Sequence, residues 1–334
     1  MNNLDTERFP QLPPVIPPLP NSPDRPLWSV MIPAYNCAAF IPDAINSVLA
    51  QDPGRELMQI QLVDDASTDA DVQSLVEALG KGRVEYYRQP SNVGPIRNFE
   101  TCINRSRGHV VHLLHGDDRV LPGFYAKLGQ LLHRYPEAGA AVSHYSYIEE
   151  AGRPNGIPTA QAQTEGLLDN WLLRLAEYQR LQYVSTVVRR TVYEELGSFY
   201  GPPYGEDWEM WVRIARHYPF VYTPEILGEY RGHIHSLSWS KLTSGELVPD
   251  LLQVIARIQA HVPAPHRKRL AQLTSKHYAH YVISSAYRSA EITKDWGFVH
   301  QLVKKSLQLS RHPAIYNHLV RSWAKYILSK IRKE

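Results

Sequence analysis

The chain has 334 residues, of which 43% are hydrophobic and 21% are charged, and it carries a formal net charge of +3. A chain of this size can bury a complete hydrophobic core and leaves room for one large domain with a smaller appendage. It contains no run of about 18 apolar residues, which excludes a membrane-spanning helix, and its basic residues form no recognised nucleic-acid-binding module. The polar, acidic N-terminus is unlike a signal peptide, so we expect a cytoplasmic protein with no nucleic-acid partner.

The charge is divided unevenly along the chain. Residues 261–334 hold 14 Lys and Arg against 3 Asp and Glu, a balance of +11, whereas residues 1–260 carry −8. A basic C-terminal region on an acidic body predicts an anionic surface or partner for that region. The same division predicts that the acidic body, residues 1–260, attracts cations or polar substrates.

Buried strands and amphipathic helices alternate after a proline-rich start. Residues 10–26 contain eight prolines, which predict a polyproline II arm or linker that cannot join a sheet. The apolar run at 27–32 predicts a strand that Pro33 ends. Apolar spacing predicts helices at 40–49, 72–79 and 95–106 and further strands at 58–63, 84–87 and 110–114. This alternation is typical of a parallel sheet covered by helices on both faces.

Polar clusters follow these strands. They are Pro33-Ala34-Tyr35-Asn36, Asp64-Asp65-Ala66-Ser67-Thr68-Asp69, Asn92-Val93-Gly94 and Gly116-Asp117-Asp118. In such sheets ligands bind beyond the carboxyl ends of the strands, so the four clusters predict one crevice. The chain has neither a Gly-x-Gly-x-x-Gly after the first strand nor a Gly-x-x-x-x-Gly-Lys loop, which argues against a dinucleotide site or a phosphate loop of those types. Asp69 is predicted to cap the helix that follows it.

The last quarter of the chain changes character. Segments near 247–261, 266–291, 296–309 and 313–332 have a helical period, with prolines at their joints. We therefore predict three parts: a proline-rich arm over 1–26, an α/β domain over 27–245, and a helical, basic C-terminal region over 246–334.

Asp117 and Asp118 directly follow the apolar run 110–114. Burying each carboxylate would cost on the order of several kcal/mol unless it is paired or bound to a metal. A divalent cation that bridges both carboxylates to a diphosphate would remove that cost. The alternative for such a pair is an ordinary turn or a helix N-cap.

Six short motifs occur in order along the chain. They are Val30-Met31-Ile32-Pro33-Ala34-Tyr35-Asn36, Val63-Asp64-Asp65-Ala66-Ser67-Thr68-Asp69, Asn92-Val93-Gly94 with Arg97-Asn98, Gly116-Asp117-Asp118, Gly205-Glu206-Asp207-Trp208, and Tyr230-Arg231-Gly232-His233-Ile234-His235-Ser236-Leu237-Ser238. In this order and spacing, from about residue 29 to 238, they resemble the family-2 glycosyltransferases with a GT-A fold. The resemblance implies a Rossmann-like α/β fold with a mostly parallel sheet, helices on both faces and a C-terminal helical appendage.

The resemblance also implies a binding site for a nucleotide-diphosphate sugar. Pro33 and Tyr35 would face the nucleotide, with the Tyr35 ring available to pack on a base. Asp65 would accept a hydrogen bond from uracil, and Arg97 would donate one to the base. From the residues alone, Tyr35 could instead pack at a turn, and Asp64 could cap the following helix.

For the metal, the resemblance points to the acidic pair. Asp117 would face the ribose, and Asp118 would bind the Mn²⁺ or Mg²⁺ that holds the two donor phosphates. His233 would be a further ligand of the metal or the diphosphate, with His235 as a competing candidate. Arg231 is a candidate contact for phosphate.

For catalysis, the resemblance points to Glu206 and Asp207, with Asp207 as the general base. An inverting transfer needs one carboxylate to take the proton of the acceptor hydroxyl. A solvated helix start is the alternative, because carboxylates favour the first turn of a helix. Trp208 and Trp211 could form a platform for an acceptor sugar or pack in the core.

The implied function is an inverting glycosyltransferase that moves a sugar from a nucleotide-diphosphate donor to a hydroxyl of a saccharide or lipid-linked acceptor. A non-catalytic nucleotide-sugar-binding or scaffold protein of the same fold is one alternative, against which the presence of Asp117, Asp118 and Asp207 argues. A sugar-phosphate nucleotidyltransferase is another. Such an enzyme would carry a glycine-rich and basic loop after the first strand, which this chain lacks.

The C-terminal segment 319–332 combines an apolar and a basic face. Leu319, Val320, Trp323, Ile327 and Ile331 share one helical face, and Arg321, Lys325 and Arg332 line a neighbouring one. One interpretation is a packed helix with a solvated basic edge. The other is contact with an anionic membrane surface, which would place the protein peripherally at the inner face of the cell membrane.

Overall fold

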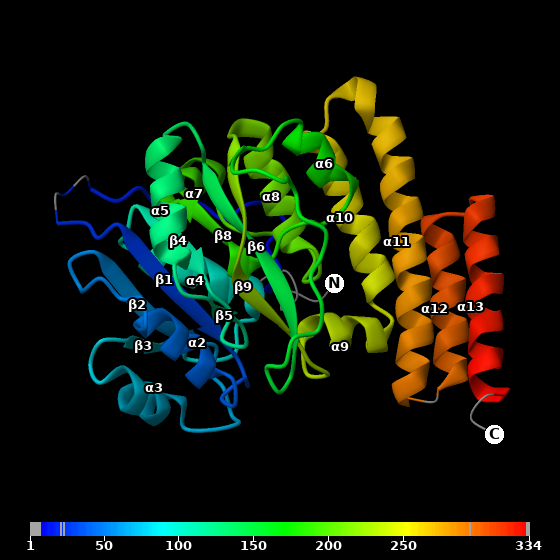
Figure 1. Cartoon of the computed structure of the whole chain (residues 1–334), viewed down its shortest axis with the longest axis horizontal. Coiled ribbons are helices and arrows are strands. Elements are labelled where there is room, and N and C mark those ends of the chain that lie inside the picture. The colour runs from blue at the N-terminus through cyan, green and yellow to red at the C-terminus, as the bar shows by residue number, and fades with distance from the viewer. Residues whose placement is uncertain (1–7, 21, 23, 294, 332–334) are drawn as a thin grey trace. The chain divides into compact units, whose positions relative to one another are not determined.

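The structure is a computed structural model that describes residues 8–20, 22, 24–293 and 295–331 (Figure 1). The chain divides into two compact units. The sheet unit consists of residues 1–171 and 180–233, and the helical unit of residues 172–179 and 234–334. The helical unit thus takes a short segment from the middle of the chain. The three-part division at residues 26 and 245 stays a prediction.

The sheet unit carries all the strands found in the described residues. They are β1 (Trp28–Ala34), β2 (Met58–Asp64), β3 (Glu85–Arg88), β4 (Val110–Leu113), β5 (Arg119–Val120), β6 (Ala140–Glu149), β7 (Gly166–Leu167), β8 (Thr186–Arg189) and β9 (Phe220–Gly232). Its helices are α2 (Ile41–Leu49), α3 (Val72–Gly80), α4 (Pro95–Arg105), α5 (Phe124–Arg134), α7 (Arg190–Leu196) and α8 (Glu206–His217), with a 3₁₀ turn at Tyr183–Ser185.

These strands form one mixed sheet in the order β3-β2-β1-β4-β8-β6-β9-β5, with β7 paired to β9. The pairs β2/β3, β1/β2 and β1/β4 are parallel, as the alternation of strands and helices predicts. On the other side, β8 runs antiparallel to both β4 and β6, and β9 runs parallel to β6. The predicted fold class, an α/β sheet flanked by helices with a helical C-terminal region, is confirmed.

Helices cover both faces of the sheet around β1 (Figure 1). Trp28, Val30 and Ile32 alternate along β1 and pack in one core with residues of α2, α3 and α5. Met31, which points the opposite way, is also buried, and α4 packs against β1 with its own buried Phe99. Two buried faces explain why the strand is apolar except for Ser29, rather than alternating between apolar and polar residues.

The expectation that Pro33 ends the first strand is wrong, because β1 continues to Ala34 and Pro33 pairs with Val63 of β2. The last pair between β1 and β4 is Met31 with Leu113. Pro33 directs its carbonyl oxygen to the β4 side, where it accepts a hydrogen bond from the Gly116 N–H. Its missing N–H would point to that same side, beyond the end of β4, so the ladder loses no bond there.

The proline-rich arm stays outside the sheet, as predicted, and packs along the sheet unit. Ile16 is fully buried. The Ser198 N–H donates to the Pro14 carbonyl oxygen at 2.8 Å, and the Gly201 N–H donates to the Pro10 carbonyl oxygen at 2.9 Å. The arm therefore holds the segment that connects α7 to α8.

The helical unit contains α9 (Leu237–Ser244), α10 (Leu247–His261), α11 (Ala264–Thr293), α12 (Trp296–Leu309) and α13 (Pro313–Ile331), and most of α6 (Trp171–Glu177). The hydroxyl of Thr274 donates to the Ala176 carbonyl oxygen, and the Gln179 N–H donates to the Tyr278 hydroxyl. These bonds tie the segment 172–179 to α11. Among the described residues, no helix is long and apolar enough to cross a membrane.

Candidate active site

The polar clusters predicted to form one crevice lie at the carboxyl ends of adjacent strands. The Asp65 N–H donates to the Ala34 carbonyl oxygen at 2.9 Å, and the Gly116 N–H donates to the Pro33 carbonyl oxygen at 3.1 Å. The loop after β3 joins through a bond from the Asn92 side chain to the Asp65 carboxylate at 2.9 Å. The ends of β1, β2 and β4 and the loop after β3 therefore form one connected rim.

Tyr35 stands at the end of β1 with 51% of its surface exposed. The next residue, Asn36, has a φ of +49° and accepts a hydrogen bond from the Thr68 N–H at 2.8 Å. The Ser67 hydroxyl accepts the Asn36 N–H at 3.0 Å. This locked turn presents the Tyr35 ring to solvent at the rim, whereas Pro33 is buried within the strand.

Asp65 is almost completely buried, and its carboxylate accepts three hydrogen bonds. Oδ1 accepts the Val93 N–H at 2.7 Å, and Oδ2 accepts the Gly94 N–H and the Asn92 amide, both at 2.9 Å. Burial raises the pKa of Asp65, although the two backbone N–H groups partly oppose the rise. The carboxylate thus organises the loop 92–94 as well as facing the rim.

The other acidic side chains after β2 have structural partners, and the prediction that Asp69 caps the next helix is wrong. Asp71 caps α3, with its side chain accepting the Ser74 N–H. Asp69 instead accepts the Ala38 N–H at 2.9 Å. Asp64 accepts the Ser67 N–H and pairs with Arg88, so it stabilises the turn rather than capping α3. The residue that caps a helix directly precedes its first turn. Asp69 lies two residues before the capping residue, Asp71.

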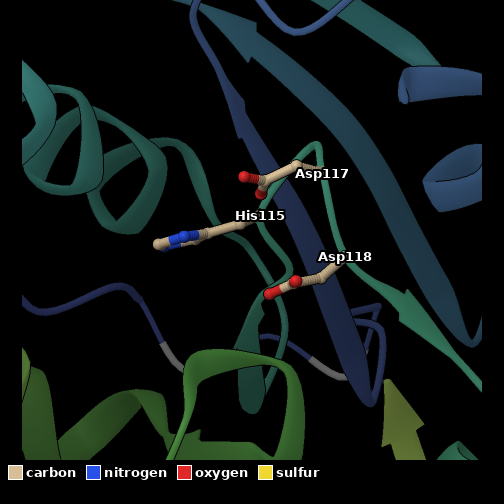
Figure 2. A group of neighbouring side chains, drawn as sticks. All are labelled: His115, Asp117 and Asp118. Atoms are coloured by element: carbon tan, nitrogen blue, oxygen red, sulfur yellow. The ribbon is translucent and has the colours of Figure 1, made fainter. Parts of the chain in front are cut away.

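Beyond β4, three side chains form an acid cluster of His115, Asp117 and Asp118 (Figure 2). One ligand atom from each lies within 4.8 Å of the others. Asp118 is 1% exposed, and its Oδ1 accepts the Arg231 backbone N–H at 2.8 Å. The Nε2 of His115 is buried with no hydrogen-bond partner among the described residues. The two carboxylates of the cluster suit Mn²⁺ and Mg²⁺.

The two carboxylates differ in their electrostatics. Burial and the neighbouring charge of Asp117 raise the pKa of Asp118 well above its usual range, despite the opposing bond from Arg231. For Asp117, burial also favours the neutral form, but the hydrogen bond from His233 and the nearby imidazoles outweigh it and lower the pKa. Two carboxylates this close repel each other, and a cation between them would relieve the repulsion.

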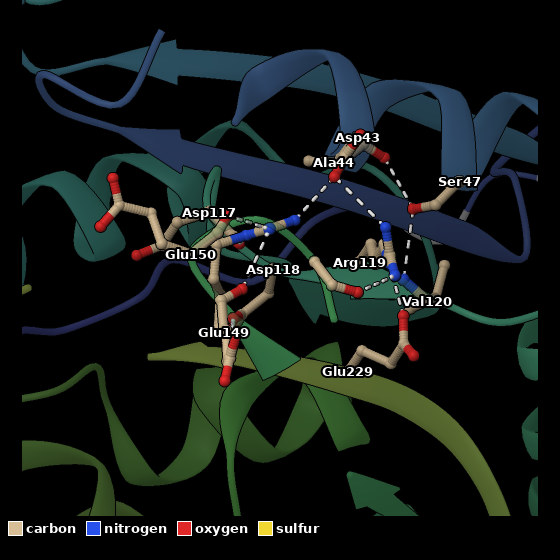
Figure 3. Close-up of polar contacts among 12 residues, drawn as sticks. Asp43, Ala44, Ser47, Asp117, Asp118, Arg119, Val120, Glu149, Glu150 and Glu229 are labelled. Carbon is tan, nitrogen blue, oxygen red and sulfur yellow. Dashed lines mark hydrogen bonds and ion pairs between the residues drawn. The ribbon is translucent and has the colours of Figure 1, made fainter. Parts of the chain in front are cut away.

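The end of β9 closes the site from the other side. His233 Nε2 lies 2.9 Å from Asp117 Oδ2, and the His233 side chain is only 5% exposed. Arg231 donates from Nε to the Asp117 carbonyl oxygen at 2.7 Å and from Nη2 to Asp43 at 2.7 Å (Figure 3). Its Nη1 donates to the Glu150 carbonyl oxygen at 2.7 Å.

The suggestion that Arg231 contacts phosphate therefore finds no support in its bonds, because all three of its side-chain nitrogens donate to the protein. Arg231 instead fixes the loop that carries the acid cluster. The competing candidate His235 is exposed and belongs to the helical unit.

The motif Glu206-Asp207 is connected to the acid cluster through the rings of His115 and Tyr183. The His115 ring lies 4.3 Å from the Tyr183 ring, centroid to centroid, and the Tyr183 hydroxyl donates to Glu206 Oε1 at 3.2 Å. Glu206 is the first residue of α8 and is 6% exposed. Asp207 is half-buried beside it and accepts the Trp208 N–H at 2.7 Å through Oδ1. Both acids therefore stand at the positive end of a helix.

Three further residues were predicted to bind the donor or the acceptor: Arg97, Trp208 and Trp211. Arg97 lies in the first turn of α4, next to the rim loop, and pairs with Glu100 at 2.6 Å. Trp208 and Trp211 are each 1% exposed, so both pack in the core. This burial favours the packing alternative over a sugar platform for the two tryptophans.

The sequence reading assigned no role to His115, although it directly precedes the Gly116-Asp117-Asp118 motif. Its position directly after an apolar strand was the available signal, because an imidazole there must be satisfied or bound. Tyr183 and Asp43 gave no signal at all, since neither lies in a recognisable motif. They join the site only through contacts made by distant parts of the chain.

The chain is similar in sequence to curated glycosyltransferases. An uncharacterized glycosyltransferase of Haemophilus influenzae is 27% identical over 218 residues, which cover 62% of this chain and 66% of the relative. The chain spans between about a third and two thirds of the length of the first curated relatives it matches.

Solved structures match over most of the chain. S. aureus TarS 1–349 in complex with UDP-GlcNAc has a TM-score of 0.64 at 13% identity and covers 92% of each chain. The mannosyltransferase PcManGT from Pyrobaculum calidifontis, in complex with GDP-Man and Mn²⁺, has a TM-score of 0.55 at 17% identity. That alignment covers 94% of this chain and 91% of PcManGT.

At such identities the solved structures show the fold alone, and the family rests on the sequence. The model of glycosyl transferase family 2 matches residues 29–197, which is just over half of the chain and includes the rim and the acid cluster. The chain belongs to glycosyl transferase family 2.

Proposed function

We propose that this protein is an inverting glycosyltransferase that moves a sugar from a nucleotide-diphosphate donor, first of all a UDP-sugar, to a hydroxyl of a saccharide or lipid-linked acceptor. The observation that carries the proposal is the short path from Asp117 through His115 and Tyr183 to Glu206. It brings two acidic motifs, about 90 residues apart in the sequence, into one site. The donors bound by the solved neighbours, UDP-GlcNAc and GDP-Man, support the donor class.

In this proposal the rim binds the nucleotide. The exposed Tyr35 ring packs on the base, and Asp65 accepts a hydrogen bond from a base N–H. Arg97 donates to the base from the start of α4, and Pro33 supports the rim from within β1. Asp117 faces the ribose. Each of these roles needs a group that is already fixed before the donor arrives, and the bonds between the rim loops supply that rigidity.

The acid cluster fits a divalent cation. It offers two carboxylates and an imidazole whose Nε2 has no partner among the described residues, and it carries a charge repulsion that a cation would relieve. In the proposal Asp118 and His233 would hold Mn²⁺ or Mg²⁺, and His115 would add a third ligand. When bound, the ion would neutralise the charge that grows on the departing diphosphate. The structure of PcManGT, a complex with GDP-Man and Mn²⁺, supports the choice of ion.

Asp207 is the proposed general base. It stands in the first turn of α8, at the positive end of the helix. One oxygen is held by the Trp208 N–H, so the carboxylate keeps a fixed direction. Asp207 takes the proton of the acceptor hydroxyl as that oxygen attacks the anomeric carbon from the face opposite the diphosphate. Glu206 supports the site through its bond from Tyr183.

The test of this function is the product released from labelled nucleotide sugars in Mn²⁺. A glycosyltransferase releases a nucleoside diphosphate and transfers the labelled sugar to an acceptor or to water. A sugar-phosphate nucleotidyltransferase, working on a nucleotide triphosphate and a sugar phosphate, releases pyrophosphate instead. Binding of the donor without any release would identify the non-catalytic alternative.

The proposed lipid-linked acceptor would bring the enzyme to a membrane surface, and the helical unit supports this. Four apolar residues of α13 are exposed at helical spacing: Tyr316 at 46%, Val320 at 65%, Trp323 at 60% and Ile327 at 37%. Arg321 is exposed beside them. The side chains of Lys325 and Ile331, and all of Arg332, lie outside the described residues, so that part of the predicted face stays a prediction.

We expect the intact protein to bind vesicles that contain anionic lipids and to release as salt rises, because each basic residue near the surface contributes up to about 1 kcal/mol. The double substitution Val320→Ser with Trp323→Ala should weaken binding at least about tenfold, since it removes the two most exposed of the four apolar residues. Leu57→Ser, at an exposed apolar residue of the sheet unit, is the matched control. If the intact protein ignores anionic vesicles at low salt, α13 does not bind membranes.

A further inference from the structure

The N-terminal arm reaches the candidate base site. Arg8, the first residue that the structure describes, donates from Nη2 to the Asn92 side-chain oxygen. Its guanidinium also lies against Gly94: a Cβ on that glycine would be 3.2 Å from the Arg8 Nε and 3.3 Å from Nη2. Asn92 and Gly94 are the residues whose N–H groups bond the carboxylate of Asp65. A positive charge from outside the sheet thus stands next to the proposed acceptor for the base.

The position of Arg8 is set by the arm that follows it. Pro10 is buried and accepts the Gly201 N–H at 2.9 Å, only two residues from Arg8. Further along, Arg190 Nη1 donates to the Pro17 carbonyl oxygen at 3.2 Å, and Arg25 Nε donates to the Arg107 carbonyl oxygen at 3.0 Å. Because proline restricts φ, this anchored arm loses little conformational freedom on docking. Arg8 is therefore delivered to the rim by a fixed segment.

Gly94 has two reasons to lack a side chain. Its φ is +88°, a conformation that favours glycine, and a Cβ there would press on the guanidinium of Arg8. The glycine of the motif Asn92-Val93-Gly94 thus leaves space for the Arg8 side chain of the N-terminal arm. A Cβ at position 94 would require the Arg8 guanidinium to shift by a few tenths of an ångström.

Arg8 and Asp65 together offer a donor next to an acceptor. Arg8 carries five N–H donors, of which the described contacts use one, on Asn92. Asp65 has about four acceptor positions and uses three of them on the loop 92–94. An adjacent donor and acceptor complement a base edge on which an N–H stands beside a C=O. Uracil and guanine have that edge, whereas cytosine has a ring nitrogen that accepts in place of the N–H.

We propose that the N-terminal arm forms one wall of the nucleobase site and that Arg8 binds the base of the donor by donating to a base carbonyl oxygen beside the N–H that Asp65 accepts. The inference rests on the proposed function, because it presumes a nucleotide donor at this rim. It adds a binding residue that lies before the first strand. A planar, fixed fork of donors makes arginine suited to the task, and lysine would replace it poorly.

Calorimetric titration of the intact protein in Mn²⁺ tests the inference. The probes are UDP and GDP, CDP as the mismatched base, and pyrophosphate, which has the two phosphates and no base. Arg8→Ala should weaken the preferred nucleotide about ten- to a hundredfold, the range for losing a hydrogen bond with a charged group. Pyrophosphate binding should stay within about twofold of the intact protein's. Arg8→Lys should recover only part of the loss.

Arg55→Ala is the matched control. Arg55 is also exposed, donates to the Gly82 carbonyl oxygen, and lies in the loop before β2, at the opposite end of that strand from the rim. It removes the same charge and should leave every affinity unchanged. Because Arg8 is exposed, Arg8→Ala should melt at the same temperature as the intact protein.

Three results for Arg8→Ala would overturn the inference while leaving the proposed function intact. Unchanged binding of UDP and GDP would mean that Arg8 does not touch the base. An equal loss for pyrophosphate would assign Arg8 to the phosphates. Tighter nucleotide binding would mean that the arm covers the site and must leave. If the intact protein binds no nucleoside diphosphate at all, the proposed function fails first, and the inference with it.

Discussion

Asp118→Asn should stabilise the protein and abolish its turnover. The ligand atoms of Asp117 and Asp118 lie within 4.8 Å of each other, which at an effective dielectric constant of about 20 corresponds to a repulsion of about 3.5 kcal/mol when both are ionised. Asparagine keeps an oxygen for the Arg231 N–H but weakens that charge-assisted bond by about 1 kcal/mol. The net gain is about 1–3 kcal/mol, or a rise of roughly 2–6 °C in Tm.

The assay is thermal unfolding in chelator and in Mn²⁺, alongside donor turnover. Mn²⁺ at a hundred times its Kd should stabilise the intact protein by about 2.7 kcal/mol and should barely shift Asp118→Asn. Full turnover in chelator, or in this variant, would remove the metal from the mechanism. A lower Tm of the variant in chelator would refute the electrostatic reasoning, because it would mean that the carboxylate is stabilising without a cation.

Asp52→Asn is a control that should lower the thermal stability, whereas Asp118→Asn should raise it. Asp52 lies far from the rim and pairs with Arg83 through two short bonds, one of 2.7 Å. Burial favours the neutral form of Asp52, but Arg83 outweighs it and lowers the pKa below the ordinary 3.8. A lowered pKa means that the pair stabilises the fold above about pH 4 and stops doing so as pH falls through the folded-state pKa. The variant should therefore melt lower than the intact protein at pH 7, and the difference should shrink toward pH 3.

Two further substitutions test the base and the backbone of the site. Asp207→Asn keeps the bond from the Trp208 N–H and loses the proton acceptor, so turnover should fall by roughly 10²–10⁴ with donor Kd unchanged. Glu206→Gln, which still accepts from Tyr183, should cost less than about tenfold, and the reverse ranking would hand the base role to Glu206. Gly116→Ala would place a Cβ 2.9 Å from the Cys37 sulfur and should lower stability by about 1–3 kcal/mol. Adding Cys37→Ala should restore part of that loss in a double-mutant cycle, and strict additivity would show that the sulfur is not the obstacle.

The sequence predicts the parallel half of the fold well because that half is built from local patterns. β2 begins at Met58, and α4 begins at Pro95, as the apolar spacing indicates. Pro33 was misjudged because its effect depends on where the neighbouring strand ends, which no local pattern reveals. Strands β8 and β9 gave no clear signal, since the strands that they pair with lie far away in the chain.

The candidate site divides in the same way. Asp117 and Asp118 follow a buried strand, so their place at the rim could be predicted from the sequence. The partnership of His115 with Tyr183 could not, because it depends on the packing of the turn before β8 against the end of β4. The same holds for Arg231, whose guanidinium serves three carbonyl or carboxylate groups from separate segments.

The segment 172–179 has a consequence for how this protein can be divided. The chain leaves the sheet unit after Trp171, joins the helical unit, returns at Arg180 and leaves again after His233. A truncation at residue 233 would therefore remove Thr274 and Tyr278. The Ala176 carbonyl oxygen and the Gln179 N–H would lose the hydrogen bonds that these two residues make with them. The helical unit therefore cannot be removed, or exchanged between relatives, by cutting the chain at a single position. A chimera that keeps either unit folded has to exchange 172–179 together with everything after 233.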